Sequence, residues 1–238
     1  MVETITYDHY PLLGKIFKYP DVGYKEEMHE VWDFLKYNYP QAAREMDSFI
    51  ELIDRKSLYE VEEIFNKTFH IQAICFLDLG YVLFGEDYKR GAFLVQMKNE
   101  QRKVSNDCGD ELPDNLPHVL TLINMTDDDE FRNQLAVLVL VPAIKKMLEE
   151  FEASRIEIRK RIMKRKHKAI ILENLDGGNI YQKALNALLH VIQTDFEAIS
   201  YPDIEYAPPA SDSFITNCNT CDLGEKTIDS PDSKKIKS

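Results

Sequence analysis

Apolar side chains recur along this chain mostly with the spacing of an α-helix. Met28, Val31, Trp32 and Leu35 stand at positions i, i+3, i+4 and i+7, which lie on one helical face. The same spacing returns near the end of the chain, on Tyr181, Ala184, Leu185, Leu188, Val191 and Ile192. Only nine glycines occur in 238 residues, and glycine is among the residues that most often weaken helices. The pattern therefore predicts an all-α protein.

Local signals mark where several of these helices begin and end. Ser57 and Glu60 have the spacing of a capping box, in which a hydroxyl and a carboxylate bind the free amides of a helix start. Pro40 suits a first helical turn, where its missing N–H is not needed. A short helix is predicted over residues 9–18 and ends at Tyr19-Pro20-Asp21, and another is predicted over Leu116–Met125.

Two segments between residues 70 and 103 give weaker patterns. His70–Phe84 is apolar almost throughout and fits either a buried helix or a buried strand. Because its neighbours are helical, we expect a buried helix, with Gly80 as a tolerated weak point. Glu86–Lys103 predicts an amphipathic helix that carries Tyr88, Ala92 and Val95 on its apolar face.

Charge and proline organise the chain beyond residue 125. The four acidic residues Asp127–Glu130 indicate a helix start, where the helix dipole favours negative charge. Pro142 lies inside an apolar run and predicts a kink or a new helix start. From there the pattern extends a helix as far as Lys168, and Asp176–Asn179 predicts a turn and the N-cap of the last helix.

The composition changes at about residue 200. The chain is 44% hydrophobic, which is ample for one sizeable core. After Ser200 there are four prolines, many Ser, Thr and Asp residues and little periodicity. We therefore expect a single-domain helical bundle over residues 1–199 and a disordered C-terminal tail over residues 200–238.

The net charge of −12 disfavours nucleic acid as a partner, because phosphate binding needs clustered Lys and Arg. One segment is strongly basic, since Arg155–Lys168 holds eight Lys or Arg residues. It could bind an acidic partner or membrane headgroups, or it could be a solvated helix face. The acidic groups Asp127–Glu130 and Asp110–Asp114 fit either a surface for an Arg-rich peptide, or helix capping and solubility.

The start of the chain has no basic segment followed by a long apolar one, so it does not predict a signal peptide. The longest apolar stretch, Leu135–Ala143, is too short to cross a membrane. These features predict a cytoplasmic protein without stable membrane insertion.

The sequence carries no motif of a common catalytic or nucleotide site, and its six histidines have no metal-ligand spacing. We therefore expect no enzymatic activity and no bound cofactor. Cys218 and Cys221 form the only CxxC pair, which fits half of a zinc or iron–sulfur site, a redox pair, or two free thiols on a tail. Cys75 lies in an apolar run and is predicted to fill the core.

One segment is similar to a known family. The residues Glu111–Pro117, ELPDNLP, resemble the ELPDHLP signature of the nitrate reductase delta-subunit family of assembly chaperones. Four further blocks follow the family's order, at Tyr10–Asp21, at Ile64–Phe69 followed by Leu77–Gly91, at Val141–Ile144 and at Tyr181–Leu189. The resemblance covers about residues 8–197. Asn115 stands where many members have histidine, so no role of that histidine carries over.

The resemblance implies a helical chaperone that binds the N-terminal segment of an apo molybdopterin oxidoreductase catalytic subunit. It also implies that the chaperone supports insertion of iron–sulfur clusters and of the molybdenum cofactor before export or membrane docking. The client could be a nitrate reductase, a nitrite oxidoreductase or another relative, and the chaperone could be a monomer or a dimer.

Binding of such a segment needs an apolar groove with an acidic rim. The apolar runs Leu77–Phe84 and Leu116–Leu120, with the acidic residues beside them, are the predicted sources of this groove. The predicted peptide-binding residues are Asp78, Tyr81, Phe84, Glu86, Asp87, Glu111, Asp114, Asn115, Leu116, His118 and Val119.

Two other functions fit the same sequence. A metal-binding or redox protein would use Cys218 and Cys221 and would hold zinc or iron. A structural subunit would instead remain in the mature enzyme complex.

Overall fold

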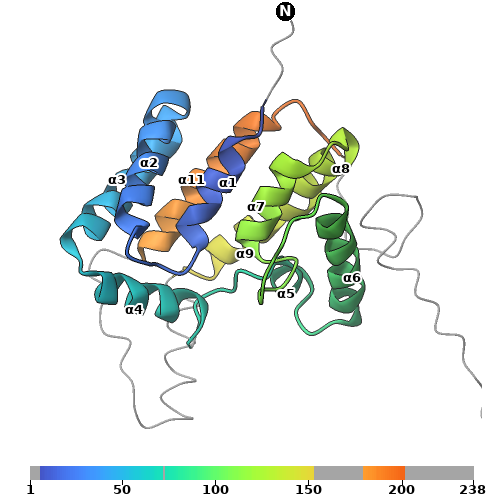
Figure 1. Ribbon diagram of the computed structural model, residues 1–238, viewed down its shortest axis with the longest axis horizontal. Helices are drawn as coiled ribbons and strands as arrows, with labels where there is room; N and C mark the ends of the chain where they lie inside the picture. The colour runs from blue at the N-terminus through green and yellow to red at the C-terminus, as the bar shows by residue number, and fades with distance from the viewer. Residues whose placement is uncertain (1–5, 72, 153–178, 202–238) are drawn as a thin grey trace, which may run out of the picture.

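The computed structural model of the chain describes residues 6–71, 73–152 and 179–201. In these ranges the regular structure is helical, with one isolated β-bridge and no strand (Figure 1). The predicted all-α, single-domain bundle is confirmed. The basic segment Arg155–Lys168, the expected helix extension to Lys168, the Cys218–Cys221 pair and the tail beyond Tyr201 lie outside the described residues.

The N-terminal half is built as the local signals predict. Its elements are α1 (His9–Gly14), the 3₁₀ turn η1 (Lys15–Phe17), α2 (Tyr24–Asn38), α3 (Pro40–Arg55) and α4 (Leu58–Phe69). Pro40 opens α3, and both hydrogen bonds of the Ser57–Glu60 capping box are formed at the start of α4. Met28, Val31 and Leu35 lie on the buried face of α2.

The segment from His70 to Phe84 departs from the prediction of one buried helix. Only α5 (Leu79–Phe84) is helical, and the residues before it form an irregular chain. This irregular backbone can be buried because the amides of Ile74 and Cys75 donate to the Thr68 carbonyl. Cys75 is buried, as predicted for a core filler.

The next helix, α6 (Tyr88–Lys103), is confirmed, but its predicted apolar face is wrong. Tyr88 and Val95 are exposed, whereas Phe93, Met97 and Gln101 are buried. Gln101 belongs to the buried face because its amide donates to the Pro113 carbonyl over 2.8 Å. A polar residue on the buried face hides the helical period from the sequence pattern.

The following helices are α7 (Leu116–Met125), α8 (Asp129–Gln134) and α9 (Val141–Glu149), with the π-helical stretch η2 (Leu135–Leu140) joining the last two. The Asp128 side chain accepts the Phe131 amide and caps α8, as the acidic run predicts. Pro142 stands in the first turn of α9, directly after the π-helical residues. A change of helix type before Pro142 accommodates the ring, which would otherwise clash with the preceding turn.

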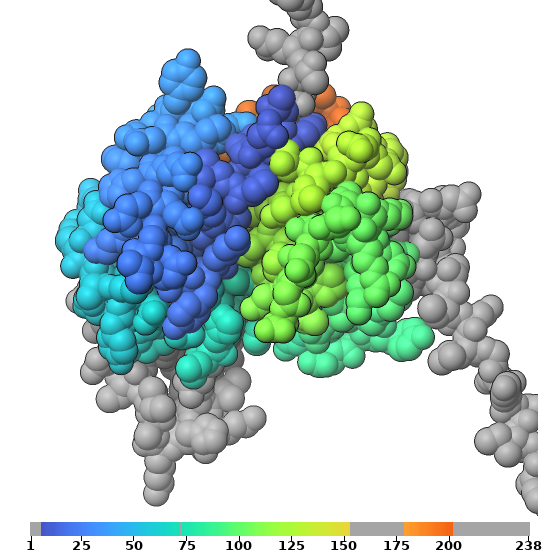
Figure 2. Space-filling view, in the orientation of Figure 1, coloured from blue at the N-terminus to red at the C-terminus, as the bar shows by residue number. Residues whose placement is uncertain are grey.

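The last helix, α11 (Ile180–Asp195), packs against both α3 and α9 and so lies at the centre of the bundle (Figure 1). Its start is fixed by Asn179, whose side chain accepts the Tyr181 amide and donates to Thr68. Figure 2 shows the chain before α5 and the chain from α6 to α8 as two neighbouring halves of one face.

A polar cluster joins the two ends of the described chain inside this bundle. The Asp195 carboxylate accepts hydrogen bonds from Tyr10 over 2.9 Å and from Tyr39 over 2.5 Å, and it lies 2.8 Å from His9. Burial, followed by this carboxylate, raises the pKa of Tyr10 well above its usual value. The cluster therefore holds α1 and the start of α3 against the end of α11.

None of the helices in the described ranges combines the length and the apolar character that a membrane span requires.

Candidate functional site

The segment that carries the ELPDNLP motif is held against the start of α5 by its backbone. The Leu79 amide donates to the Asp114 carbonyl over 3.1 Å, and the Leu116 amide donates to the Leu77 carbonyl over 2.9 Å. These two bonds form the antiparallel bridge between Asp78 and Asn115. Two segments that are more than thirty residues apart in sequence thus form one rigid wall.

The Asp114 side chain strengthens this contact from inside. It is fully buried, and its Oδ2 accepts the Gly80 amide over 2.7 Å. A Cβ at position 80 would lie 2.8 Å from Oδ2 and 2.9 Å from the ring of Phe93. Gly80 is therefore not the tolerated weak point that its sequence position suggests, because the close approach of Asp114 requires glycine.

Burial without full compensation makes this carboxyl group unusual. Its Oδ1 accepts no hydrogen bond from any described residue. The pKa of Asp114 is raised to about 6, mainly by burial and also by the nearby charge of Asp78. The hydrogen bond from the Gly80 amide and the charge of Arg90 lower the pKa but do not cancel this rise. The carboxyl group therefore changes charge near pH 6.

Asn115 and Asp78 extend the same wall to the surface. The Asn115 side-chain amide donates to Asp78 over 3.2 Å, and the residue is only 9% exposed. In the family signature that the segment resembles, histidine often stands here. In this chain the amide instead orients the Asp78 carboxylate.

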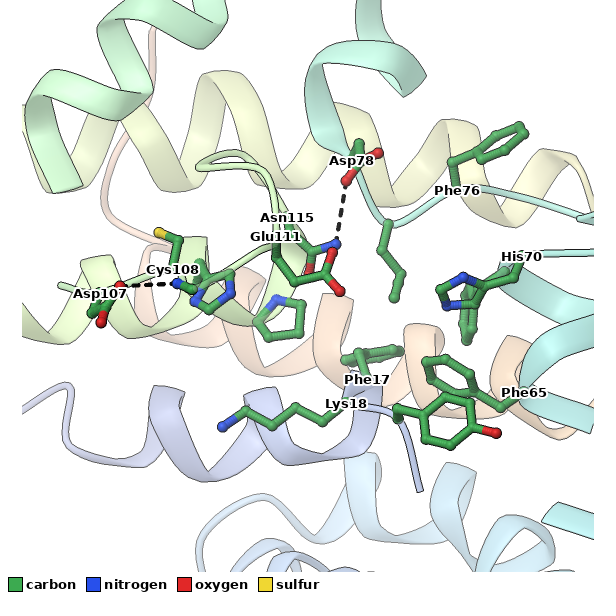
Figure 3. A pocket seen from close by; sticks show the side chains of 16 residues that line it. Phe17, Lys18, Phe65, His70, Phe76, Asp78, Asp107, Cys108, Glu111 and Asn115 are labelled. Atoms are coloured by element: carbon green, nitrogen blue, oxygen red, sulfur yellow. Dashed lines mark hydrogen bonds between the residues drawn. The ribbon is translucent and has the colours of Figure 1, made fainter. Parts of the chain in front are cut away.

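A cavity of about 870 Å³ opens in front of this wall (Figure 3). Its lining comes from the end of η1, the end of α4, the chain before α5, the loop after α6 and the start of α7. The lining residues are Phe17, Lys18, Tyr19, Phe65, Phe69, His70, Phe76, Leu77, Asp78, Asp107, Cys108, Gly109, Glu111, Asn115, Pro117 and His118. The volume falls within the range of sites that hold organic ligands or peptide side chains.

Aromatic rings form one side of the cavity. Phe17, Phe65 and Phe69 are nearly buried and make its floor, while Tyr19 and Phe76 stand at its rim with 52% and 37% of their surface exposed. The rings of Phe65 and Phe69 meet edge to face at 5.1 Å. Water therefore reaches this apolar surface mainly at the rim.

Charged groups form the other side. Figure 3 shows Phe17, Phe65 and His70 on one side and Asp107 and Cys108 on the other, with Asp78, Glu111 and Asn115 between them. Within the described residues, Asp78, Asp107 and Glu111 form no ion pair with a Lys or Arg side chain. Burial lowers the pKa of His118, so that its ring is neutral at neutral pH. The cavity is therefore acidic.

Four of the predicted peptide-binding residues meet in this cavity: Asp78, Glu111, Asn115 and His118. Three others are corrected by the structure, because Asp114, Leu116 and Val119 are fully buried and no docked peptide can reach them in this conformation. Asp114 binds Gly80, whereas Leu116 and Val119 belong to the core face of α7.

The remaining predicted residues lie elsewhere. Phe84 packs on the core with its ring 5.5 Å from that of Phe93. Glu86 and Asp87 lie on the exposed turn before α6, where Asp87 caps the helix. Tyr81 lines a second cavity of about 440 Å³.

Phe76 lines both cavities, and its ring meets that of Tyr81 at 4.6 Å. An occupant that moved this ring would therefore change the second cavity as well.

Sequence reasoning missed the aromatic side of the site. Phe65 and Phe69 match the core face of α4, and Phe17 matches the end of a short helix. Each therefore resembles an ordinary core residue. The residues with the best sequence signal were Tyr19 and Phe76, because an aromatic residue beside Pro20 or beside the buried Cys75 can mark an apolar edge.

The described residues contain no group of three or more potential ligands that could hold a metal ion. Burial and the charge of Asp107 raise the pKa of the Cys108 thiol, which disfavours the reactive thiolate. The geometry of the cavity therefore supports binding of a ligand more than covalent chemistry.

No family model matches this chain, and no curated protein is significantly similar to it. The resemblance to the nitrate reductase delta-subunit chaperones is therefore carried only by the five motif blocks in their shared order.

Proposed function

We propose that this protein is a dedicated assembly chaperone that binds the N-terminal segment of an apo molybdopterin oxidoreductase catalytic subunit. The client is an enzyme of the nitrate reductase or nitrite oxidoreductase kind. The chaperone holds it ready for cofactor insertion in the cytoplasm, before export or membrane docking. Its own role is binding, and it needs neither a catalytic residue nor a cofactor.

The observation that carries the proposal is the composition of the large cavity. An aromatic floor and an acidic wall lie side by side, and Glu111 and Asn115 of the ELPDNLP motif belong to that wall. An amphipathic segment presents apolar and polar side chains on opposite faces, which matches this arrangement. Part of the motif therefore lines the cavity.

The location of the cavity also suits a reversible binder. It is lined by chain ends and loops from both halves of the bundle, so that an occupant would contact η1, α4 and the start of α7 together. Sites built from loops on a rigid helical frame accept new contacts without a change of the core.

Calorimetry with the full chain and a synthetic peptide tests the proposal directly. The peptide is the N-terminal segment of a molybdopterin oxidoreductase catalytic subunit from the same organism. We expect saturable binding, and we expect Phe76→Ala to weaken it about tenfold, because truncating an aromatic anchor removes roughly 1–2 kcal/mol.

Tyr88→Ala is the matched control, since Tyr88 is an exposed aromatic residue outside the cavity. Its affinity should equal that of the unmodified protein. The proposal fails if the peptide does not bind and a strain lacking this chain still produces a fully metallated enzyme.

A further inference from the structure

Helix α6 (Tyr88–Lys103) carries apolar residues on two opposite faces. Phe93 and Met97 are buried on its inner face, whereas Tyr88 and Val95 lie on the other side with 63% and 62% of their surface exposed. Figure 1 shows this helix at the outer edge of the bundle, and α5 is its main partner among the described helices. The fold of one chain therefore explains the inner apolar face and leaves the other without a partner.

Five exposed residues form this second face, which we call the outer face of α6. They stand at positions i, i+3, i+7, i+10 and i+14 of the helix, and so they follow one line along it. They are Tyr88, Gly91, Val95, Lys98 and Arg102. The spacing is that of the seam along which two helices pack side by side.

Gly91 supports contact with a second helix at this face. Glycine in the middle of a helix is destabilising relative to alanine, and a methyl group at position 91 would meet no atom within 4 Å. The packing of one chain thus gives no reason for glycine here. A second helix on the outer face would give one, because the missing side chain lets its backbone approach closely.

The charges along α6 indicate the direction of that second helix. Glu86 and Asp87 stand directly before its first residue, and Lys98, Arg102 and Lys103 lie near its end. The side chains of Lys98 and Arg102 form no ion pair within the described residues. Because one end is acidic and the other is basic, a copy of the same helix in the opposite direction is complementary to it.

We propose that two copies of this chain form a dimer in which their α6 helices pack antiparallel through the outer face. Val95 stands halfway between Tyr88 and Arg102, so the twofold axis passes beside it and the two Val95 side chains meet. Arg102 of each copy then lies opposite Tyr88 and Asp87 of the other. It makes a cation–π contact with the ring and an ion pair with the carboxylate.

This dimer is small and reversible. One pair of helices of this length buries at most about 1,200 Å², which is the lower limit of standard interfaces, and we expect a dissociation constant on the order of tens of micromolar. No residue of α6 lines the large cavity. The inference therefore does not depend on the function proposed for that cavity.

Two other kinds of partner are less complementary to the outer face. An anionic membrane surface would attract Lys98 and Arg102, but it would repel Glu86 and Asp87 at the other end. An acidic protein surface meets the same conflict. Only a partner with both signs of charge in reversed order satisfies both ends.

Sedimentation velocity of the full chain between about 5 µM and about 500 µM tests the proposal, because dimerisation follows mass action. We expect a monomer–dimer equilibrium that Val95→Glu weakens at least about tenfold, since this variant places two carboxylates side by side at the twofold axis. Val22→Glu is the matched control, because Val22 is 89% exposed and lies outside α6. It should leave the equilibrium unchanged.

A second variant separates the contact from a general loss of structure. Arg102→Glu should weaken the dimer about three- to tenfold, because the new carboxylate faces Asp87 of the other copy. Both Val95 and Arg102 are exposed, so neither variant should lower the urea midpoint measured at a concentration where the chain is monomeric.

Cysteine cross-linking tests the position of the axis. In a background in which Cys108, Cys218 and Cys221 are replaced by serine, only the buried native thiol remains. Val95→Cys should then form an intermolecular disulfide rapidly under mild oxidation, since the two side chains meet at the axis. Tyr59→Cys is the control, because Tyr59 is 74% exposed on α4 and should cross-link only slowly.

A chain that stays monomeric up to about 500 µM would overturn the inference. A dimer that Val95→Glu leaves intact would also overturn it, because the copies would then meet through another face. Equal cross-linking rates at positions 95 and 59 have the same meaning. If the chain is monomeric but binds vesicles of phosphatidylserine and phosphatidylcholine in equal parts, and Val95→Glu abolishes this binding, the outer face serves a membrane surface and the dimer is wrong.

Discussion

The Oδ2 atom of Asp114 lies 2.7 Å from the backbone nitrogen of Gly80 and accepts its hydrogen. This bond joins the ELPDNLP motif to the first turn of α5, and the bridge between Asp78 and Asn115 runs beside it. The motif therefore has a structural role that its prolines alone do not explain. It fixes the wall on which Asp78, Glu111 and Asn115 enter the cavity.

The close fit between Gly80 and Asp114 predicts opposite effects of the same substitution at two glycines. Gly80→Ala should destabilise the protein by about 1–3 kcal/mol, because the new methyl group would meet Asp114 and Phe93 at less than 3 Å. Gly91→Ala should stabilise it by about 0.5–1 kcal/mol, since position 91 lies in α6 with no atom within 4 Å of the new group.

Urea unfolding of the two glycine variants checks this pair. Equal midpoints for Gly80→Ala and the unmodified protein would show that the wall yields at no cost. That result would contradict the close packing described here.

The raised pKa of Asp114 predicts how stability depends on pH. The pKa is about 6 in the folded chain and close to 3.8 in the unfolded chain, so the folded state binds more protons between these values. Stability therefore falls as the pH rises through this window, by an amount on the order of 1–3 kcal/mol, and the loss is complete above about pH 7.

Asp114→Asn keeps an oxygen for the Gly80 amide and removes the charge. We expect it to be at least as stable as the unmodified protein near pH 8 and to lose most of the pH dependence between about pH 4 and pH 6. Asp114→Ala leaves the Gly80 amide without a partner and should cost about 1–3 kcal/mol near pH 4. The cost should be smaller near pH 8, because this variant also removes the buried charge. If Asp114→Asn keeps the pH dependence of the unmodified protein between about pH 4 and pH 6, Asp114 is not the group that causes it.

Local signals gave most of the helices correctly. The Ser57 capping box, the Asn179 cap and the apolar face of α2 each depend on residues within one or two turns of each other, and short-range geometry decides them. The overall fold class follows from the sum of such signals.

Two features of the fold could not be predicted because distant residues decide them. Ile74, Cys75 and Leu77, before α5, are buried without being helical, since the Thr68 carbonyl and the Leu116 amide bind their backbone. The buried face of α6 contains Gln101, which is tolerated only because Pro113 accepts its amide hydrogen and Asn106 donates to its oxygen. Neither partner is visible in a periodic pattern.

Only part of the candidate site could be predicted, because the rest of it also depends on contacts between distant residues. Glu111 and Asn115 belong to a motif, and Asp78 is a polar residue inside an apolar run. The sequence alone therefore indicates each of them as a candidate site residue. The aromatic floor comes from η1 and α4, where every ring also matches a core position. Only the packing of distant segments shows that these rings share one cavity.

The hydrogen bond between Asn115 and Asp78 predicts a charge-specific effect on the wall. Asn115→Asp would place two carboxylates about as close as the 3.2 Å that now separates donor and acceptor. Their repulsion raises the pKa of at least one, so the folded state would lose stability as the pH rises through that raised pKa. We expect a loss of about 1–3 kcal/mol at neutral pH, reduced by the favourable charge at the start of α7.

Asn115→Ala serves as the control, because it removes the hydrogen bond without adding a charge. Its loss should be about 1 kcal/mol and nearly independent of pH. Thermal unfolding of both variants near pH 5 and near pH 8 distinguishes them. Parallel pH profiles would mean that position 115 does not place its side chain beside Asp78.

The cluster around Asp195 predicts that a single hydroxyl helps to hold the N-terminal helices to α11. Tyr39→Phe removes the 2.5 Å bond to the Asp195 carboxylate and should cost about 1–2 kcal/mol, because bonds to charged acceptors are the stronger kind. Tyr37→Phe, two residues earlier and 88% exposed, should change stability by less than about 0.5 kcal/mol.

Hydrogen exchange gives the more specific measurement for this cluster. Loss of the Tyr39 bond should speed exchange in α1 and at the end of α11, since His9, Tyr10 and Asp195 share the same cluster. Exchange in α6 should be unchanged, because α6 contributes no residue to the cluster. A uniform acceleration in all helices would instead indicate a global loss of stability, with no special role for Tyr39 in joining the two ends of the chain.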